Sequence, residues 1–180
     1  YCDVHRLGLR QRLEIFQTIC SAVHYAHQNL VIHRDIKATN ILVAADGTPK
    51  LLDFGIAKLI DSAGQVTDGR TREGAVIMTP TNAAPEQLLG AAVTTATDVY
   101  ALGLLLYRLL TGYPAFDTDG LTPTEFARAI CQQDVVKPSR RLQQAQRSAS
   151  RSMIGEGAHA LETLASDRRT NLSRLQRQLR

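Results

Sequence analysis

The first part of the chain carries a hydrophobic pattern of helical period. Between residues 9 and 28 the apolar side chains recur at steps of three and four residues, which gathers them on one face of a helix. We therefore predict a helix over residues 9–28 that is buried on one side. The positions that share the predicted face are Leu13, Phe16, Ile19, Cys20, Val23 and Ala26.

Two short apolar runs follow, with the spacing of a β-hairpin. Residues 40–43 and 50–52 are predicted to be strands, and Asp46-Gly47 between them is a dipeptide typical of tight turns. From Ile56 to Ala84 the periodicity is lost and Gly, Thr and Asp are frequent. We predict a long loop there, and loops of that length usually carry a function.

The rest of the chain is predicted to be mainly helical. Apolar side chains nearly encircle a helix over residues 98–110, which Gly112 and Pro114 end, and such a helix belongs at the centre of a core. A shorter helix is predicted over residues 125–132. The Arg-, Gln- and Ser-rich residues 138–152 have the composition of an exposed linker, and spaced leucines after residue 160 indicate terminal helical pieces.

Composition adds limits to this picture. The 180 residues are 44% hydrophobic, enough for one sizeable core, and with 5% aromatic residues and no Trp that core is aliphatic. The three cysteines are widely spaced and form no C-x-x-C pair, so we expect reduced thiols and a cytoplasmic location. No window has the ~18 uncharged apolar residues of a membrane span. The chain begins with neither Met nor a signal sequence, so we expect it to begin inside a larger protein.

Basic charge is concentrated near the end of the chain. The formal net charge is +4, but residues 137–180 contribute +7 and the remainder −3. No aromatic residues interleave with these Arg and Lys residues, which favours exposed linker and helix surfaces over a nucleic-acid site. We expect no nucleic-acid partner.

The chemistry is concentrated in residues 33–40, H-R-D-I-K-A-T-N, and in Asp53-Phe54-Gly55 after the second predicted strand. These two segments resemble the catalytic loop H-R-D-x-x-x-x-N and the D-F-G motif of protein kinases. Residues 79–86 resemble the P+1 loop and the A-P-E motif, and residues 98–103 resemble the start of the central helix of the large lobe. The resemblance covers about residues 1–131 and points to bacterial Ser/Thr kinases of the eukaryotic-like, Hanks type.

The resemblance implies a fold: mainly α with a small β-hairpin, that of a kinase large (C-terminal) lobe. Residues 1–136 would be a partial kinase lobe, and residues 137–180 a basic linker and terminal helices that continue it and are truncated. The N-terminal lobe would be missing, because no G-x-G-x-x-G loop and no V-A-I-K-type Lys is present.

The implied function of the parent protein is ATP-dependent phosphorylation of Ser/Thr hydroxyls on protein substrates. Asp35 would accept or orient the proton of the substrate hydroxyl, and Lys37 would place positive charge near the γ-phosphoryl group of ATP. Asn40 and Asp53 would bind Mg²⁺, with Mn²⁺ as an alternative, because carboxylate and amide oxygens suit such cations.

Other residues would have supporting roles. Arg34 would pair with a phosphate on Thr67 or Thr71, since guanidinium and phosphate form bidentate pairs. Thr79 would hydrogen-bond the catalytic Asp and Lys, as in Ser/Thr kinases. Five residues would have structural roles: His33, Phe54, Gly55, Glu86 and Asp98. His33 would brace the loop and the D-F-G backbone, and Asp98 would bind backbone N–H groups of the catalytic loop. The usual Arg partner of Glu86 has no counterpart after Cys131.

Two departures and two alternatives accompany this interpretation. Ala38 stands where Pro is usual, and Asn82 where the P+1 loop usually has Tyr. One alternative is a non-catalytic, kinase-like binding or scaffold module that uses the basic tail. The other is a phosphotransferase of related fold that acts on small molecules.

A first prediction follows from the absence of the Gly-rich loop and its Lys. Those elements clamp the ATP phosphates from above, so this chain alone is expected to bind Mg-ATP poorly and to be inactive by itself. Titration of Mg-ATP against the isolated chain is the measurement. A dissociation constant in the micromolar range would contradict the prediction.

Overall fold

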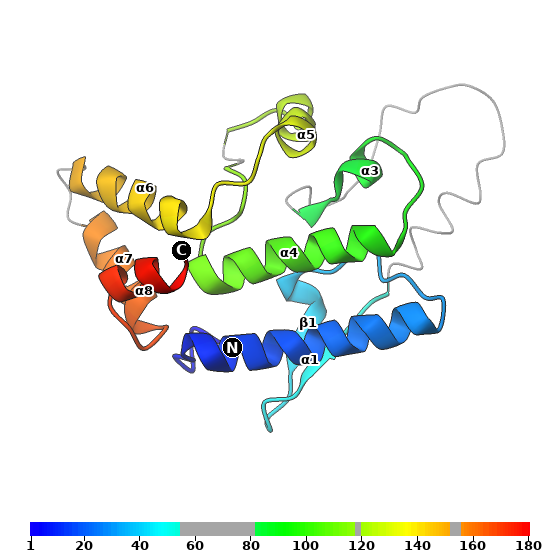
Figure 1. Ribbon diagram of the computed structural model, residues 1–180, viewed down its shortest axis with the longest axis horizontal. Coiled ribbons are helices and arrows are strands. Elements are labelled where there is room, and N and C mark those ends of the chain that lie inside the picture. The colour runs from blue at the N-terminus through cyan, green and yellow to red at the C-terminus, as the bar shows by residue number, and fades with distance from the viewer. Residues whose placement is uncertain (55–81, 118–119, 152–155) are drawn as a thin grey trace.

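The computed structural model describes residues 1–54, 82–117, 120–151 and 156–180 (Figure 1). It confirms the expected class, because helices dominate and the strands form a single two-stranded antiparallel sheet. In these ranges no helix has the length and apolar character that crossing a lipid bilayer requires. The elements are α1 (Leu9–Gln28), a 3₁₀ turn (Ala38–Asn40), β1 (Ile41–Val43), β2 (Pro49–Leu51), α3 (Pro85–Leu88), α4 (Thr95–Thr111), α5 (Pro123–Gln132), α6 (Pro138–Arg151), α7 (Glu156–Ser166) and α8 (Leu172–Gln178).

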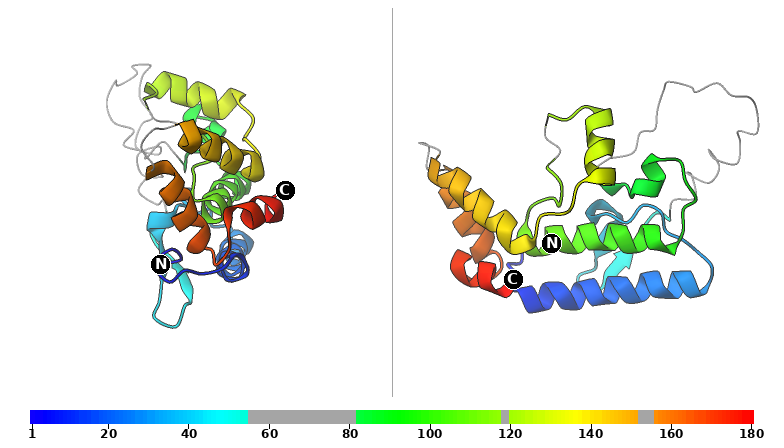
Figure 2. Two further views of the ribbon diagram at one scale, coloured as in Figure 1. Left: turned by 90° about the vertical axis from the view of Figure 1, so that its left-hand side faces the viewer. Right: turned by 45° about the horizontal axis from the view of Figure 1, so that its top comes forward.

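Helices α1 and α4 lie side by side and run in opposite directions, as both Figure 1 and Figure 2 show. The end of α1 meets the start of α4 through His27 and Asp98, and the start of α1 meets the end of α4 through Arg12 and Leu109. Helix α1 begins and ends where its hydrophobic period predicts. The core between the two helices consists of Ile19, Val23, Ile36, Ala101 and Leu102.

The boundaries of α4 follow from its capping residues. The Thr94 hydroxyl accepts a hydrogen bond from the Ala96 N–H (3.2 Å) at the start, and Gly112 ends the helix with a left-handed φ of 76°. A Cβ at Gly112 would come within 2.6 Å of the Leu164 side chain, so glycine is required there. The expectation that α4 is apolar and buried all round was wrong at Val99, which is 61% exposed.

The β-hairpin forms around the predicted turn. Ile41 pairs with Leu51 and Val43 with Pro49, and Gly47 takes the left-handed φ of 86° that the turn requires. The Asp46 carboxylate accepts a hydrogen bond from the Thr48 N–H (2.9 Å), which fixes the turn. The sheet packs on α1 and so holds the residues that flank it against the helical body.

Helix α6 corrects the prediction of an exposed linker over residues 138–152. The segment is helical from Pro138 to Arg151 and packs on α4, α7 and α8. Arg, Gln and Ala all favour helix, and Leu142, which is fully buried, supplies the apolar contact that the polar composition concealed. Whether a unit boundary lies at residue 136 stays a prediction.

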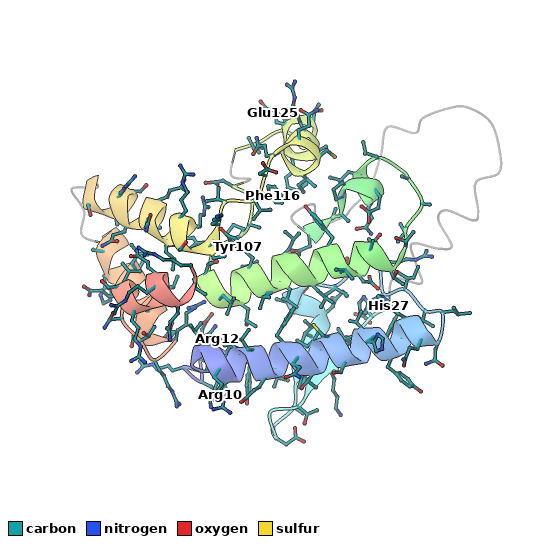
Figure 3. All side chains as sticks on the ribbon, viewed as in Figure 1. Arg10, Arg12, His27, Tyr107, Phe116 and Glu125 are labelled. Carbon is teal, nitrogen blue, oxygen red and sulfur yellow. The ribbon has the colours of Figure 1, made fainter. Side chains whose placement is uncertain are left out.

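Two buried guanidinium groups, those of Arg12 and Arg168, join the two ends of the chain to α4. Figure 3 shows the position of Arg12 near the start of α1. Arg12 is 1% exposed and donates to the carbonyl oxygens of Leu7, Leu109, Cys2 and Asp167 and to the Asp3 carboxylate (2.7 Å). Arg168 is 3% exposed and donates to the carbonyl oxygens of Leu110, Leu164 and Leu109. Each guanidinium therefore satisfies carbonyl groups at or near the end of α4 that the helix itself leaves without donors.

The charges of this cluster shift two pKa values. Burial, together with the positive charge of Arg12, lowers the pKa of Arg168 to about 10. Burial acts to raise the pKa of Asp3, but the hydrogen bond from Arg12 and the charges of both guanidiniums lower it overall. At neutral pH Arg168 is therefore positively charged and Asp3 negatively charged.

Replacing Arg12 with Ala is predicted to destabilise the fold by about 3–5 kcal/mol, because four carbonyl oxygens from three segments would each lose a hydrogen bond and the Asp3 carboxylate would lose its ion pair with Arg12. The matched control is Arg10→Ala, two positions earlier in the same helix. The Arg10 side chain is 93% exposed, and among the described residues it pairs only with Glu14 (3.1 Å). Urea unfolding followed by circular dichroism measures both variants. Equal midpoints for the two would show that the Arg12 contacts do not support the fold.

Candidate catalytic site

The carboxylate of Asp98 fixes the start of residues 33–40. It lies in the first turn of α4, is 1% exposed, and accepts hydrogen bonds from the backbone N–H groups of His33 and Arg34, both at 2.8 Å. The His27 ring, at the end of α1, contacts the same carboxylate at 2.7 Å. These are the backbone contacts that the resemblance implies for Asp98. The sequence analysis did not single out His27, whose pairing across 71 positions has no local signal.

Arg34 has a strained backbone conformation, which hydrogen bonds with Asp98 and Gln87 maintain. Its φ is 68°, in the left-handed region that side chains with a Cβ rarely occupy. Its N–H is held by Asp98, and its carbonyl oxygen accepts a hydrogen bond from Gln87 Nε2 (2.9 Å). Such strain persists where the surroundings enforce it, and it is concentrated at functional sites.

Three of the predicted site residues meet at one carboxylate oxygen. Asp35 Oδ2 accepts a hydrogen bond from Asn40 Nδ2 at 2.9 Å and forms an ion pair with Lys37 Nζ at 2.9 Å. Asn40 Nδ2 also donates to the Asp35 carbonyl oxygen at 2.9 Å, and the 3₁₀ turn over residues 38–40 places the Asn40 side chain where it can do so. The Asn40 amide nitrogen is thus committed to Asp35, which leaves the amide oxygen as the group that can act as a ligand.

Asp53 is held near the catalytic loop through contacts of the residues on either side of it, Leu52 and Phe54. The Leu52 N–H donates to the Asn40 carbonyl oxygen (2.8 Å), and the Leu52 carbonyl oxygen contacts His33 Nε2 (3.1 Å). The Phe54 ring packs against the His33 ring with centroids 4.6 Å apart. The Asp53 side chain is exposed, and its backbone is left-handed with φ 52°. The structure therefore brings residue 53 beside the catalytic loop.

His33 is held as a neutral imidazole with one defined tautomer. Nδ1 accepts a hydrogen bond from the Asp35 N–H (3.3 Å), so Nε2 must carry the proton that it shares with the Leu52 carbonyl oxygen. The ring is fully buried, and burial lowers the pKa of His33 despite the opposing charge of Asp98. A second proton on Nδ1 would face the Asp35 N–H, so the neutral form is the one that fits.

The oxygen donors at this site fit a hard divalent cation. The Asn40 amide oxygen and the Asp53 carboxylate are of the ligand type that Mg²⁺ prefers, and Mg²⁺ takes few protein ligands because it keeps water and binds phosphate oxygens. Mn²⁺ accepts the same donors. Across the described ranges no cluster of three or more His, Cys, Asp and Glu side chains could hold a metal ion. Asn40 and Asp53 would therefore hold such a cation together with water or phosphate oxygens.

The remaining predicted residues divide into two groups. The Glu86 carboxylate accepts a hydrogen bond from the Thr97 hydroxyl and is partly exposed, so it has a partner that the sequence analysis did not find. Asn82 is partly buried at the start of the segment that leads into α3, and Ala38 is exposed in the 3₁₀ turn. The predicted residues that lie outside the described ranges are Gly55, Thr67, Thr71 and Thr79.

Comparison with known proteins agrees with this geometry. The model of the protein kinase domain family matches residues 5–175. The chain belongs to the protein kinase family. The match continues past Cys131, where the resemblance was expected to end, and so includes helices α6 and α7 and the start of α8.

Several bacterial Ser/Thr protein kinases are similar to this kinase chain. It is 40% identical over 132 residues to serine/threonine-protein kinase PknB of Mycobacterium leprae, covering 73% of this chain and 20% of the relative. The same protein of Mycobacterium tuberculosis H37Rv is 39% identical over the same shares. A probable serine/threonine-protein kinase PknB of Lactococcus lactis is 42% identical over 109 residues, 61% of this chain and 17% of the relative. The chain matches about a fifth of the length of these relatives, which are Hanks-type kinases as the sequence analysis expected.

A prediction follows from the state of His33. Because its folded pKa lies below the ordinary value of 6.5, the unfolded chain binds more protons below pH 6.5 than the folded chain does. Stability is therefore complete above pH 6.5 and falls as the pH drops toward the folded pKa. Urea unfolding at a series of pH values is expected to show a shallower slope for His33→Gln than for the unaltered chain.

Nitrogen NMR of the unaltered chain provides the second measurement. The pattern of couplings should identify the Nε2–H tautomer at pH 7, with a titration midpoint below 6.5. An Nδ1–H tautomer, or equal pH slopes for the two proteins, would contradict this account of His33.

Proposed function

We propose that the complete kinase to which this chain belongs transfers the γ-phosphoryl group of ATP to Ser and Thr hydroxyls of protein substrates. The observation that carries the proposal is the meeting of Lys37 and Asn40 at Oδ2 of Asp35, each at 2.9 Å. Phosphoryl transfer needs a positioned hydroxyl and charge stabilisation more than covalent chemistry from the protein, and this group of side chains offers both.

The described contacts give each side chain a distinct role. Asn40 holds the Asp35 carboxylate at its Oδ2 atom, so that this side chain can orient a substrate hydroxyl and receive its proton. Lys37, partly buried beside Asp35, has a positive charge that can be shared with the transferred phosphoryl group. Asn40 and Asp53 would hold Mg²⁺ or Mn²⁺, and the bound cation would neutralise charge on the ATP phosphates.

Ser and Thr are the proposed acceptors, and two observations support them. The similar proteins are named serine/threonine-protein kinases. Thr79 is the residue that the family resemblance assigns to hydrogen bonds with Asp35 and Lys37, a feature of kinases that act on aliphatic hydroxyls. We propose a cytoplasmic location for the activity, which the free cysteines and the need for ATP support.

Arg34 supports regulation by phosphorylation of the segment between Asp53 and Glu86. Its Nε atom is buried and has no hydrogen-bond partner among the described residues, a state that is unfavourable for a guanidinium donor. A phosphate group carries several strong acceptor oxygens and pairs with a guanidinium in bidentate geometry. Phosphorylated Thr67 or Thr71 is the proposed partner.

Replacing Asp35 with Asn in the complete kinase is predicted to lower kcat at least 100-fold, because the amide cannot accept the hydroxyl proton. The KM for ATP should change less than threefold, since the substitution leaves the metal ligands in place. Asp46→Asn, the same chemical change in the exposed hairpin turn, is the control and should retain full activity. Radiolabel transfer to Ser-, Thr- and Tyr-containing peptides measures both. An active Asp35→Asn variant, or preference for Tyr, would contradict the proposal.

A further inference from the structure

Gln87 uses both ends of its side-chain amide. It is the third residue of helix α3, where its Oε1 accepts a hydrogen bond from the Ala84 N–H at 3.0 Å. This is half of a capping box, an arrangement that holds the first turn of a helix. Its Nε2 donates to the Arg34 carbonyl oxygen at 2.9 Å, 53 positions earlier in the chain. One amide therefore joins the helix that begins within the A-P-E segment to the catalytic loop.

This second hydrogen bond completes a clamp on Arg34. The peptide groups on either side of the Arg34 Cα are both held, the N–H by Asp98 Oδ1 (2.8 Å) and the carbonyl oxygen by Gln87 (2.9 Å). These two bonds act on the strained φ of 68° from two different helices, α4 and α3. The Arg34 carbonyl belongs to the same peptide unit as the Asp35 N–H, which donates to His33 Nδ1. Release of the carbonyl would therefore let the peptide that leads into Asp35 rotate.

Helix α3 can act as the fixed side of this clamp. Ala83 and Ala84 are 1% and 0% exposed, so the start of the helix is anchored in the interior. Glu86, next to Gln87, accepts the hydroxyl hydrogen bond of Thr97 in α4. Gln87 is thus set on a short helix that is itself attached to the central helix.

We propose that Gln87 is a positioning residue for phosphoryl transfer, which holds the Arg34–Asp35 peptide in the orientation that aims the catalytic carboxylate. The catalytic part of this proposal rests on the proposed function. The structural basis of the proposal is that residue 87 carries an amide and not a carboxylate. A Glu at this position would cap α3 equally well, because capping boxes accept Glu or Gln, but a carboxylate has no hydrogen to donate to the Arg34 carbonyl.

Gln87→Glu therefore separates the two roles of the side chain. It keeps the acceptor for the Ala84 N–H and replaces the donor to Arg34 with an oxygen. Gln11→Glu is a matched control, because Gln11 is also the third residue of its helix and accepts the Gly8 N–H at 3.1 Å. Among the described residues, the Gln11 amide nitrogen donates no hydrogen bond. The same chemical change there alters a cap and nothing more.

In the complete kinase, Gln87→Glu is expected to lower kcat about 10- to 100-fold with the KM for ATP within twofold, since small misplacements of a reacting group have effects of this size. Gln11→Glu should leave both constants unchanged. A purely structural role would instead lower the thermal midpoint of Gln87→Glu and leave kcat intact in the folded fraction. That result, or full activity of Gln87→Glu, would overturn the proposal.

NMR of this chain separates the proposal from the proposed function. In Gln87→Glu the backbone ¹³C and ¹⁵N shifts of Arg34 should move away from left-handed values, and those of Asp35 should change with them. In Gln11→Glu both sets of shifts should stay in place. If the complete kinase is inactive before any substitution, the proposed function fails while these shifts still decide whether Gln87 holds the loop. Unmoved shifts in Gln87→Glu would overturn the inference whatever the activity.

Discussion

The site depends on the carboxylate of Asp98, which is 1% exposed at the start of α4. A charge in the interior is stable only when hydrogen-bond donors surround it, so the residues around Asp98 are constrained to supply them. The backbone N–H groups of His33 and Arg34 do so at 2.8 Å, with the His27 ring at 2.7 Å. To point both N–H groups at one carboxylate, the loop adopts the left-handed conformation at Arg34. The strain is therefore a consequence of satisfying a buried charge.

Side chains of opposite charge lie at the two ends of helix α4, in the arrangement that the helix dipole favours. Asp98 lies in the first turn, where the dipole is positive, and the guanidinium groups of Arg12 and Arg168 bind carbonyl oxygens of Leu109 and Leu110, where it is negative. The first end organises the catalytic loop. The second end joins the N-terminal turn to the α7–α8 connection (Figure 2). One helix thus links the chemistry to the stability of the whole lobe.

Local patterns predicted the elements well and the contacts between them poorly. The helix over residues 9–28 and the hairpin around Gly47 follow from periodicity and turn chemistry, which are local properties. Helix α6 was missed because a polar composition outweighed its helix propensity and its one fully buried leucine, Leu142. The motif located Asp35, Lys37 and Asn40, but Arg12, Arg168, His27 and Gln87 act through partners more than 50 positions away, which no short pattern in one sequence encodes.

The conformation of the catalytic loop is determined within this lobe. Among the described residues, the side chains of Gln87 and Asp98 and the Leu52 backbone hold it from outside, and His27 acts on it through Asp98. The contacts among Asp35, Lys37 and Asn40 are likewise internal to residues 35–40. Because the same helices also carry the core, preorganisation of the site and folding of the lobe are one event, and a change that loosens Asp98 should affect both.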